Sequence, residues 1–361
     1  MCRLLFAVCS FEGTDVFVRS ELRTANRELP TSLCYTPADM RGAVYVNGKI
    51  APAHQAVVPV YDHGFVYGEG VYETLRTYNK VPFLYDRHMR RLRQSADRLL
   101  LDVPFDDATL LQWIDQTVAA AFSETRSERS GASGPRAASE LGGVQGSPPL
   151  NNEAYIRILL TRGVGDLNYD PKSTPKPTTV IIVKPFEPPA ARVFNDGIRI
   201  SLVEMLRNHP KSVNPIIKSN NLLNNALAMQ TAYRAGAEEA LMCNYRGELT
   251  ECSQANFFMV RGGAALTPKS EAGLLEGVTR AFIFELGREI GVNVREETLY
   301  PKDLETADEM FITSTTRELS PVVNVDGRVV GSGRPGQITR ALLARYQQRA
   351  QELTESLIAD R

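Results

Sequence analysis

A lysine between an apolar stretch and a polar one is the first residue of this sequence that could do covalent chemistry. Lys218 follows Ile216 and Ile217 and precedes Ser219-Asn220-Asn221. A lysine held in an apolar wall loses part of the solvation of its ammonium group, so its pKa falls and the neutral amine becomes a nucleophile. Most lysines are solvated surface residues, however, so Lys218 needs support from other parts of the chain.

Three further segments carry groups that suit a phosphate. The segment Gly277-Val278-Thr279-Arg280 opens a predicted helix, where free backbone N–H groups and the positive end of the helix dipole favour an anion. The run Thr313-Ser314-Thr315-Thr316 adds hydroxyl donors, and Arg91 offers a guanidinium that matches a phosphate. Each has a plainer interpretation, because helix ends are commonly just capped, threonine runs often lie on sheet surfaces and Arg91 could face water.

A glutamate and a Tyr–Arg pair could contact the other parts of a small ligand. Glu251 ends a predicted hairpin strand, and its carboxylate, if buried, could keep a pyridine nitrogen protonated. Tyr155 and Arg157 lie two residues apart on a predicted strand, so they project from the same face. An aromatic ring beside a guanidinium suits a substrate with a carboxylate and a hydrophobic tail. The plainer interpretations are a surface glutamate and ordinary cross-strand packing.

The composition of the whole chain favours a small-molecule partner. The net charge of −1 provides no field that would recruit nucleic acid or an anionic membrane, and no apolar run reaches membrane-spanning length. The four histidines show no ligand spacing, so no metal site is predicted. The five cysteines form no CxxC pair and their number is odd, which predicts a reducing compartment, the cytoplasm.

Strands and helices are interspersed along the chain without a regular βαβ alternation, which predicts an α+β protein of two domains. The 361 residues are long enough for two packed domains. We interpret residues 1–40 as an N-terminal extension, residues 41–185 as a smaller α+β domain and residues 191–361 as a larger domain. The proline-rich residues 186–190 are the predicted linker. Residues 124–152, dominated by Ser, Gly, Pro and charged residues, predict a flexible insertion in the smaller domain.

Hydrophobic periodicity and turn residues predict the elements that position these candidates. Helices are predicted over residues 86–99, 108–122, 220–235, 277–290 and 338–357, and the principal strands over residues 154–161, 178–184, 197–206, 239–243, 248–252 and 255–260. A hairpin through Asp326-Gly327 is predicted over residues 322–330. In this arrangement Arg91 lies on a helix, whereas Lys218 precedes one.

Seven segments occur in a fixed order along the chain. They are Asp62-His-Gly-Phe-Val-Tyr67-Gly-Glu-Gly-Val-Tyr-Glu73-Thr-Leu-Arg, His88-Met-Arg-Arg91-Leu, Tyr155-Ile-Arg157 with Thr161-Arg-Gly-Val-Gly-Asp-Leu, Lys218-Ser-Asn-Asn221-Leu-Leu-Asn-Asn, Glu251 with Asn256, Leu275-Glu-Gly-Val-Thr279-Arg, and Ser314-Thr-Thr-Arg-Glu-Leu-Ser-Pro-Val. In this order, from about Val44 to Tyr346, the sequence resembles the class IV aminotransferases, the fold type IV family of pyridoxal-phosphate enzymes. An ordered series of motifs is far more specific than any one of them.

The resemblance implies pyridoxal 5′-phosphate as cofactor and a role for each matching residue. Lys218 would carry the cofactor as a Schiff base and move the proton during transamination, Glu251 would pair with the ring nitrogen, and Leu275 would pack on the ring face. The groups that would hold the phosphate are Arg91, the backbone of Val278 and Thr279, and Thr315. The residues that would line the substrate pocket are Tyr67, Tyr155, Arg157 and Thr316.

Within the family, Tyr155, Arg157 and the segment after Thr161 look like the branched-chain enzymes, which act on L-leucine, L-isoleucine and L-valine with 2-oxoglutarate. Thr74 stands where those enzymes usually have glycine, which predicts a narrower pocket. Leu222 and Thr315-Thr316 look like the D-amino-acid aminotransferases, although no Arg-x-His segment follows Thr161-Arg162-Gly163.

Two more functions are compatible with the sequence. The segment Glu73-Thr-Leu-Arg looks like that of the aminodeoxychorismate lyases of the same family. A non-catalytic binding protein on the same fold is the possibility from a different class, and the intact Lys218 and Glu251 argue against it. The resemblance also implies a homodimer or a higher homo-oligomer, with active sites near the subunit interface.

Overall fold

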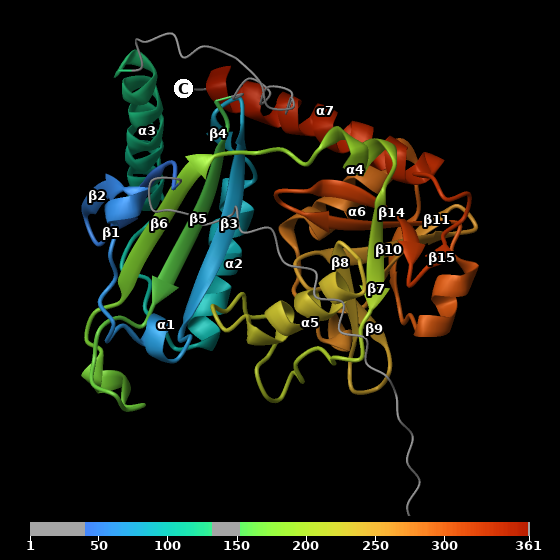
Figure 1. Cartoon of the computed structure of the whole chain (residues 1–361), viewed down its shortest axis with the longest axis horizontal. Coiled ribbons are helices and arrows are strands. Elements are labelled where there is room, and N and C mark those ends of the chain that lie inside the picture. Colours follow the sequence, from blue (N-terminus) through green and yellow to red (C-terminus); the bar gives the residue numbers. More distant parts are fainter. Residues whose placement is uncertain (1–39, 132–151, 360–361) are drawn as a thin grey trace, which may run out of the picture. The chain divides into compact units, whose positions relative to one another are not determined.

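The computed structural model describes residues 40–131 and 152–359, with the side chains of residues 124–131 excepted (Figure 1). Helices and strands are mixed along the described chain, so the predicted α+β class is confirmed. The strands form two sheets, one of six strands and one of nine. Residues 1–39 of the predicted extension and residues 132–151 of the predicted insertion lie outside the described residues.

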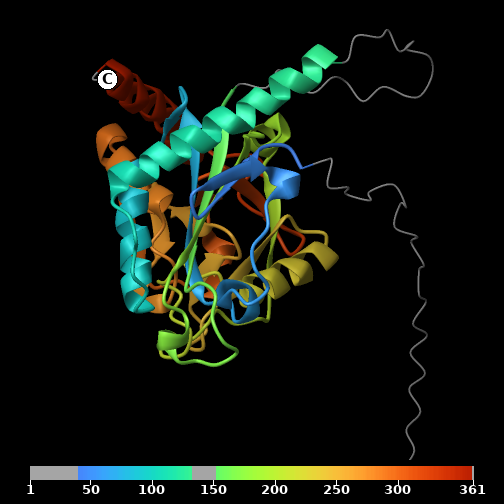
Figure 2. The ribbon, with the colours of Figure 1, turned by 90° about the vertical axis from the view of Figure 1, so that its left-hand side faces the viewer.

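The first sheet is antiparallel throughout and runs in the order β2-β1-β6-β5-β3-β4. Its strands are β1 (Ala43–Val46), β2 (Lys49–Pro52), β3 (Gly70–Tyr78), β4 (Val81–Pro82), β5 (Ala154–Thr161) and β6 (Thr178–Pro185). The short helix α1 (His63–Val66) precedes β3. Helices α2 (Tyr85–Arg98) and α3 (Asp107–Gly131) pack on the strands, and Figure 2 shows α3 crossing in front of them.

Alternation along β5 explains how this sheet separates a core face from a site face. Ile156, Ile158 and Leu160 are fully buried and pack with apolar residues of α2 and α3. Tyr155 and Arg157 point to the opposite face because successive side chains of a strand alternate. The predicted common face of these two residues is confirmed.

The second sheet runs in the order β12-β11-β10-β13-β14-β7-β8-β9, and β15 pairs with β14. Its strands are β7 (Ile198–Leu202), β8 (Glu239–Cys243), β9 (Leu249–Cys252), β10 (Asn256–Arg261), β11 (Ala264–Pro268), β12 (Val294–Glu297), β13 (Glu309–Ser314), β14 (Glu318–Val325) and β15 (Arg328–Val329). Asn256 of β10 also pairs with Glu251 of β9. This pairing closes six of the strands into a ring around an apolar core that includes Phe257, Met259 and Ile312.

Four helices accompany the second sheet: α4 (Ala191–Asn195), α5 (Leu223–Arg234), α6 (Val278–Ile290) and α7 (Gln337–Ala359). Helix α5 packs on β7 and β8, while α6 and α7 pack on each other. The aromatic residues Phe83, Phe282 and Tyr346 join α6 and α7 to the chain segment after β4. The strands of the first sheet all precede the predicted linker, and those of the second sheet follow it. A domain boundary at residues 186–190 stays a prediction.

Two predicted elements have different ends in the structure. The strand predicted over residues 197–206 stops at Leu202, and the helix predicted from Asn220 begins at Leu223. The irregular segment between them contains Pro210 and Pro215, which lack the backbone N–H that a strand or helix interior requires.

Helix α3 is longer than predicted and enters the range assigned to the flexible insertion. The prediction ended this helix at Phe122, whereas the backbone stays helical to Gly131. Residues 124–130 contain no Gly or Pro, and their Glu and Arg residues have high helix propensity. The polar composition that suggested a flexible segment is therefore compatible with an extended helix for residues 124–131.

Candidate active site

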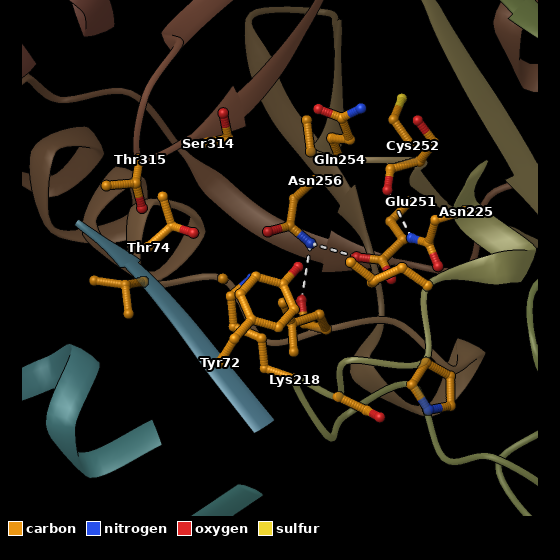
Figure 3. Close-up of a pocket in the computed structure, with 18 of the residues that line it drawn as sticks. Tyr72, Thr74, Lys218, Asn225, Glu251, Cys252, Gln254, Asn256, Ser314 and Thr315 are labelled. Atoms are coloured by element: carbon orange, nitrogen blue, oxygen red, sulfur yellow. Dashed lines mark hydrogen bonds between the residues drawn. The ribbon is translucent and has the colours of Figure 1, made fainter. Parts of the chain in front are cut away.

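A cavity of about 440 Å³ brings together residues from both sheets and from the irregular segment before α5. The predicted site residues that line it are Arg91, Tyr155, Arg157, Lys218, Glu251, Leu275, Val278, Thr279, Thr315 and Thr316. Figure 3 shows Lys218, Glu251 and Thr315 around this space. Segments more than 200 positions apart in the sequence therefore meet at one site, as the series of motifs requires.

The backbone of Lys218 is fixed on both sides. Its N–H donates to the Oγ of Ser95 on α2 at 3.1 Å, and its carbonyl oxygen accepts from the N–H of Tyr72 on β3 at 2.9 Å. The side chain is half-buried, and its Nζ lies 4.4 Å from the centroid of the Tyr72 ring. Among the described residues no carboxylate forms an ion pair with Nζ. The amine is thus held at the cavity wall and is available to react.

Glu251 is a buried carboxylate at the cavity, not the surface glutamate of the plainer interpretation. The Nε of Arg207 donates to its Oε1 at 2.8 Å. The Nδ2 of Asn256 donates to its Oε2 at 3.2 Å, as Figure 3 shows. Burial raises the pKa of Glu251, and the nearby Arg207 offsets part of that rise. A carboxylate has about four lone-pair sites, so Glu251 can accept from a further donor in addition to these two side chains and the backbone of Leu275.

Sequence reasoning did not identify Arg207. It lies in the irregular segment between β7 and α5, where no periodicity indicates which side chains face inward. Its buried guanidinium also donates to the side-chain oxygens of Asn224 and Asn225 at 3.3 and 3.5 Å. Only the folded segment shows that this cation supports Glu251.

Another part of the cavity offers donors for an anion. Helix α6 begins at Val278, and its N-cap, Gly277, provides no side-chain cap, so the first N–H groups of the helix are available. Arg91 from α2 lies beside this helix start, where its NH1 donates to the carbonyl of Glu276 at 3.1 Å. A Cβ on Gly277 would lie 2.0 Å from Oδ1 of Asn256, so the backbone can approach only with glycine there.

The remaining wall comes from β3 and β5. Thr74 of β3 pairs with Arg157 of β5 in the sheet. Tyr72 lies two residues before Thr74, so these side chains and that of Tyr155 project from the same face of the sheet. The guanidinium carbon of Arg157 lies 4.1 Å from the centroid of Tyr72. Within residues 40–131 and 152–359 Arg157 has no carboxylate partner. Tyr72 was missed, although its two-residue spacing from Thr74 could have indicated it.

Tyr67 is not among the residues that line the cavity of its own chain, so its place in the substrate pocket stays a prediction. It follows α1, whose short turn directs its ring against His63 and Tyr169, with centroid separations of 4.9 and 5.0 Å. Phe65 and Tyr169, which flank it, are 74% and 84% exposed. Tyr67 therefore belongs to an exposed aromatic surface.

The described ranges contain neither a metal-binding cluster nor a membrane-spanning helix. No group of three His, Cys, Asp or Glu side chains that could hold a metal ion is found there. None of the helices in this part of the chain is long and apolar enough to cross a membrane.

Comparisons with known proteins show the family to which the chain belongs. The model of the amino-transferase class IV family matches residues 70–325, which is more than half of the chain. This chain belongs to the class IV aminotransferases. A Methanocaldococcus jannaschii protein, provisionally named as a branched-chain-amino-acid aminotransferase, is 36% identical over 306 residues, covering 84% of this chain and 95% of that protein.

Further relatives of this aminotransferase are named for either D-alanine or branched-chain amino acids. The D-alanine aminotransferase of Listeria innocua is 32% identical over 302 residues, covering 83% of this chain and 93% of that one. A solved structure of the Escherichia coli branched-chain amino acid aminotransferase is similar, with a TM-score of 0.73 and 27% identity, and the match covers 84% of this chain and 92% of the other. A further similar structure, 26% identical, is a branched-chain amino acid aminotransferase with pyridoxamine 5′-phosphate. The protein is an aminotransferase, and its relatives differ in substrate.

The residues of this aminotransferase fit a phosphorylated pyridine cofactor. The free N–H groups at the start of α6 and Arg91 would hold a phosphate, and the buried Glu251 carboxylate would face a ring nitrogen. Thr313 is 1% exposed, and its Oγ1 has no hydrogen-bond partner among the described residues, although it lines the cavity. An unsatisfied hydroxyl in this position indicates that a polar ligand completes the site.

Proposed function

We propose that this enzyme transfers the amino group between a branched-chain L-amino acid (leucine, isoleucine or valine) and 2-oxoglutarate, with pyridoxal 5′-phosphate attached to Lys218. When bound, this cofactor supplies an electron sink for a carbanion at the substrate α-carbon. The observation that carries the proposal is the cavity that joins Lys218 and Glu251 to the Tyr155–Arg157 wall. The five cysteines support the cytoplasm as its location.

Different residues of the protein would have different roles in this reaction. The Nζ of Lys218 would hold the cofactor and then move a proton at the substrate α-carbon. The carboxylate of Glu251, supported by Arg207, would keep the ring nitrogen protonated. Arg91, Thr315 and the first N–H groups of α6 would hold the phosphate, and Leu275 would pack on the ring.

The substrate wall supports both partners of the proposed reaction. Arg157 has a guanidinium without a carboxylate partner in the described chain, which suits the second carboxylate of 2-oxoglutarate. Tyr72 and Tyr155 provide aromatic surface for an aliphatic side chain. Thr74 also lines the cavity, where its side chain narrows the space that a glycine would leave open.

A D-amino-acid aminotransferase is the second candidate. Leu222 and Thr316, the residues that look like that group, both line the cavity. Several relatives with 29–32% identity, including the Listeria innocua protein, are named D-alanine aminotransferases. The M. jannaschii protein, at 36% identity, favours the branched-chain assignment over this one.

A visible spectrum separates the two candidates. The purified protein, loaded with pyridoxal 5′-phosphate, is expected to lose the absorbance band of the lysine-bound cofactor on addition of L-leucine and to keep it with D-alanine, because amino transfer converts the cofactor to its amine form. Addition of 2-oxoglutarate should then restore the band. Loss of the band with D-alanine alone would move the enzyme to the D-amino-acid group, and a protein without any such band would contradict the cofactor assignment.

We also propose that the enzyme is a homodimer that uses an apolar surface around α1 and α5. Val57, Val60, Phe65 and Tyr169 are 79%, 65%, 74% and 84% exposed, and Leu223 of α5 is 67% exposed. A Cβ on Gly68, just after α1, would lie 3.6 Å from the Cα of Asn221, just before α5, so the chain segments next to these two helices are neighbours. Large apolar side chains that are exposed on the surface of a single chain are typical of protein interfaces. Because Tyr67 lies on the same surface, it could reach the pocket of a second copy.

Sedimentation velocity tests this assembly. The wild-type protein is expected to sediment as a dimer, whereas the double variant Phe65→Glu/Tyr169→Glu should shift toward the monomer because charged side chains would have to be buried. Val329→Glu, at a site 66% exposed on β15, is the matched control and should leave the dimer intact. A monomeric wild-type protein at micromolar concentration would contradict the proposal.

A further inference from the structure

Arg91, which lines the cavity, forms a cluster with the fully buried Glu73 and His88 behind the cavity wall, and the proposed mechanism uses only Arg91 of the three. Glu73 stands on β3 between Tyr72 and Thr74, whose side chains face the cavity (Figure 3). Because side chains alternate along a strand, Glu73 points to the other face, toward α2, and it is fully buried. It therefore cannot contact a ligand in the cavity directly.

The carboxylate of Glu73 is held by both of the α2 residues. The Nε of Arg91 lies 2.7 Å from Oε1, and the NH2 of Arg91 lies 2.8 Å from Oε2. The Nδ1 of His88, one helical turn earlier, lies 2.7 Å from the same Oε2. Burial raises the pKa of Glu73, but Arg91 and His88 together lower it by more than burial raises it. The pKa of Glu73 therefore lies well below its usual range, and the carboxylate is ionised.

These bonds leave Arg91 with one orientation. A guanidinium has five N–H groups. Glu73 takes the one on Nε and one on NH2, and the carbonyl of Glu276 takes one on NH1. One N–H on each terminal nitrogen then has no acceptor in the described part of the chain. Since Glu276 directly precedes Gly277, these free groups lie beside the available N–H groups at the start of α6.

We propose that Glu73 is a positioning residue for the cofactor phosphate: it fixes the guanidinium of Arg91 against α6 so that both present their free N–H groups to one anion. This inference rests on the proposed binding of pyridoxal 5′-phosphate and assigns to Glu73 a role through Arg91 alone. A bidentate bond that uses the Nε edge prevents rotation of the guanidinium plane. Without it, Arg91 would keep its charge but lose its fixed direction.

The test compares two ligands that differ only in the phosphate. Dissociation constants of pyridoxal 5′-phosphate and of pyridoxal are measured by absorbance titration of the cofactor-free protein. In Glu73→Gln the preference for the phosphorylated ligand is expected to fall at least tenfold, with the affinity for pyridoxal unchanged within about twofold. The neutral amide keeps the size of the side chain but meets the N–H groups of Arg91 with its own NH2 group.

Two further variants show whether the effect passes through Arg91. Arg91→Met should lower the phosphate preference at least as much, and adding Glu73→Gln to it should cause no further loss, because the positioned group is already absent. Glu285→Gln is the matched control, since Glu285 of α6 accepts two hydrogen bonds from Arg87 of α2 without lining the cavity, and it should leave the preference unchanged within about twofold.

The outcomes separate this inference from the proposed function. An unchanged phosphate preference in Glu73→Gln, an equal loss of affinity for both ligands, or an equal effect of Glu285→Gln would overturn the positioning role. If Glu73→Gln does not fold, Glu73→Asp provides the same comparison, because it keeps the charge but withdraws the carboxylate from Arg91. A wild-type protein that binds neither ligand would overturn the proposed function itself, and this inference with it.

Discussion

Replacement of Lys218 with alanine is expected to lower kcat/KM for amino transfer at least about 10³-fold and to remove the visible band of the bound cofactor. The reason is that Nζ has two roles that no neighbouring group can assume. It provides the covalent attachment, and it moves the proton at the substrate α-carbon. In the described structure the cavity contains no other lysine. The measurement is a coupled assay with L-leucine and 2-oxoglutarate together with an absorbance spectrum.

The control for this variant is Lys211→Ala. Lys211 belongs to the same irregular segment but is exposed and does not line the cavity, so its loss should leave both the activity and the spectrum unchanged. Thermal unfolding curves of the two variants would show that both are folded. Retention of wild-type turnover by a folded Lys218→Ala variant would contradict the assignment of Lys218.

Glu318→Ala is expected to lower the free energy of unfolding by about 3–5 kcal/mol, as removal of one partner of a buried ion pair does. Glu318 accepts from the NH1 of Arg76 at 3.0 Å and from the hydroxyl of Tyr78 at 2.7 Å, both on β3, and from Gln347 of α7 at 2.8 Å. The side chains of Arg76 and Glu318 are each 7% exposed. Loss of the carboxylate would leave the charge of Arg76 buried without compensation.

Urea unfolding of the cofactor-free protein measures this effect. The double variant Arg76→Met/Glu318→Ala should be less destabilised than Glu318→Ala alone, because it removes the uncompensated charge as well. Glu187→Ala, which breaks the exposed pair of Glu187 with Arg41, is the control and should change the stability by less than about 1 kcal/mol. Equal effects of Glu318→Ala and Glu187→Ala would show that the buried pair does not join the two sheets energetically.

Glu318 also has an unusual backbone conformation next to the site. Its φ of +54° is in the left-handed region, which is unfavourable for a glutamate by about 1–2 kcal/mol. It directly follows the turn that contains Thr315 and Thr316, two lining residues of the cavity. The ion pair with Arg76 compensates for this conformation and holds the turn against β3, the strand that also presents Tyr72 and Thr74.

The sequence by itself determined the chemistry of the site wherever neighbouring residues carry it. The two-residue spacing of Tyr155 and Arg157 was enough to place them on one face, because alternation along a strand is a local property. Gly277, Val278 and Thr279 could likewise be placed at a helix start from the adjacent residues alone. For Lys218 and Glu251 the residue type indicated the chemistry, but burial and partners did not follow from it.

The tertiary structure decided what depends on distant contacts. Arg207 supports Glu251 from 44 positions away, and Arg76 meets Glu318 across 242 positions. It also placed Tyr67 outside the cavity, against Tyr169, because a short turn before β3 determines the direction of its ring. The physical reason is that periodicity and turn chemistry act over a few residues, whereas a buried ion pair exists only where the packing of the whole chain brings its two charges together.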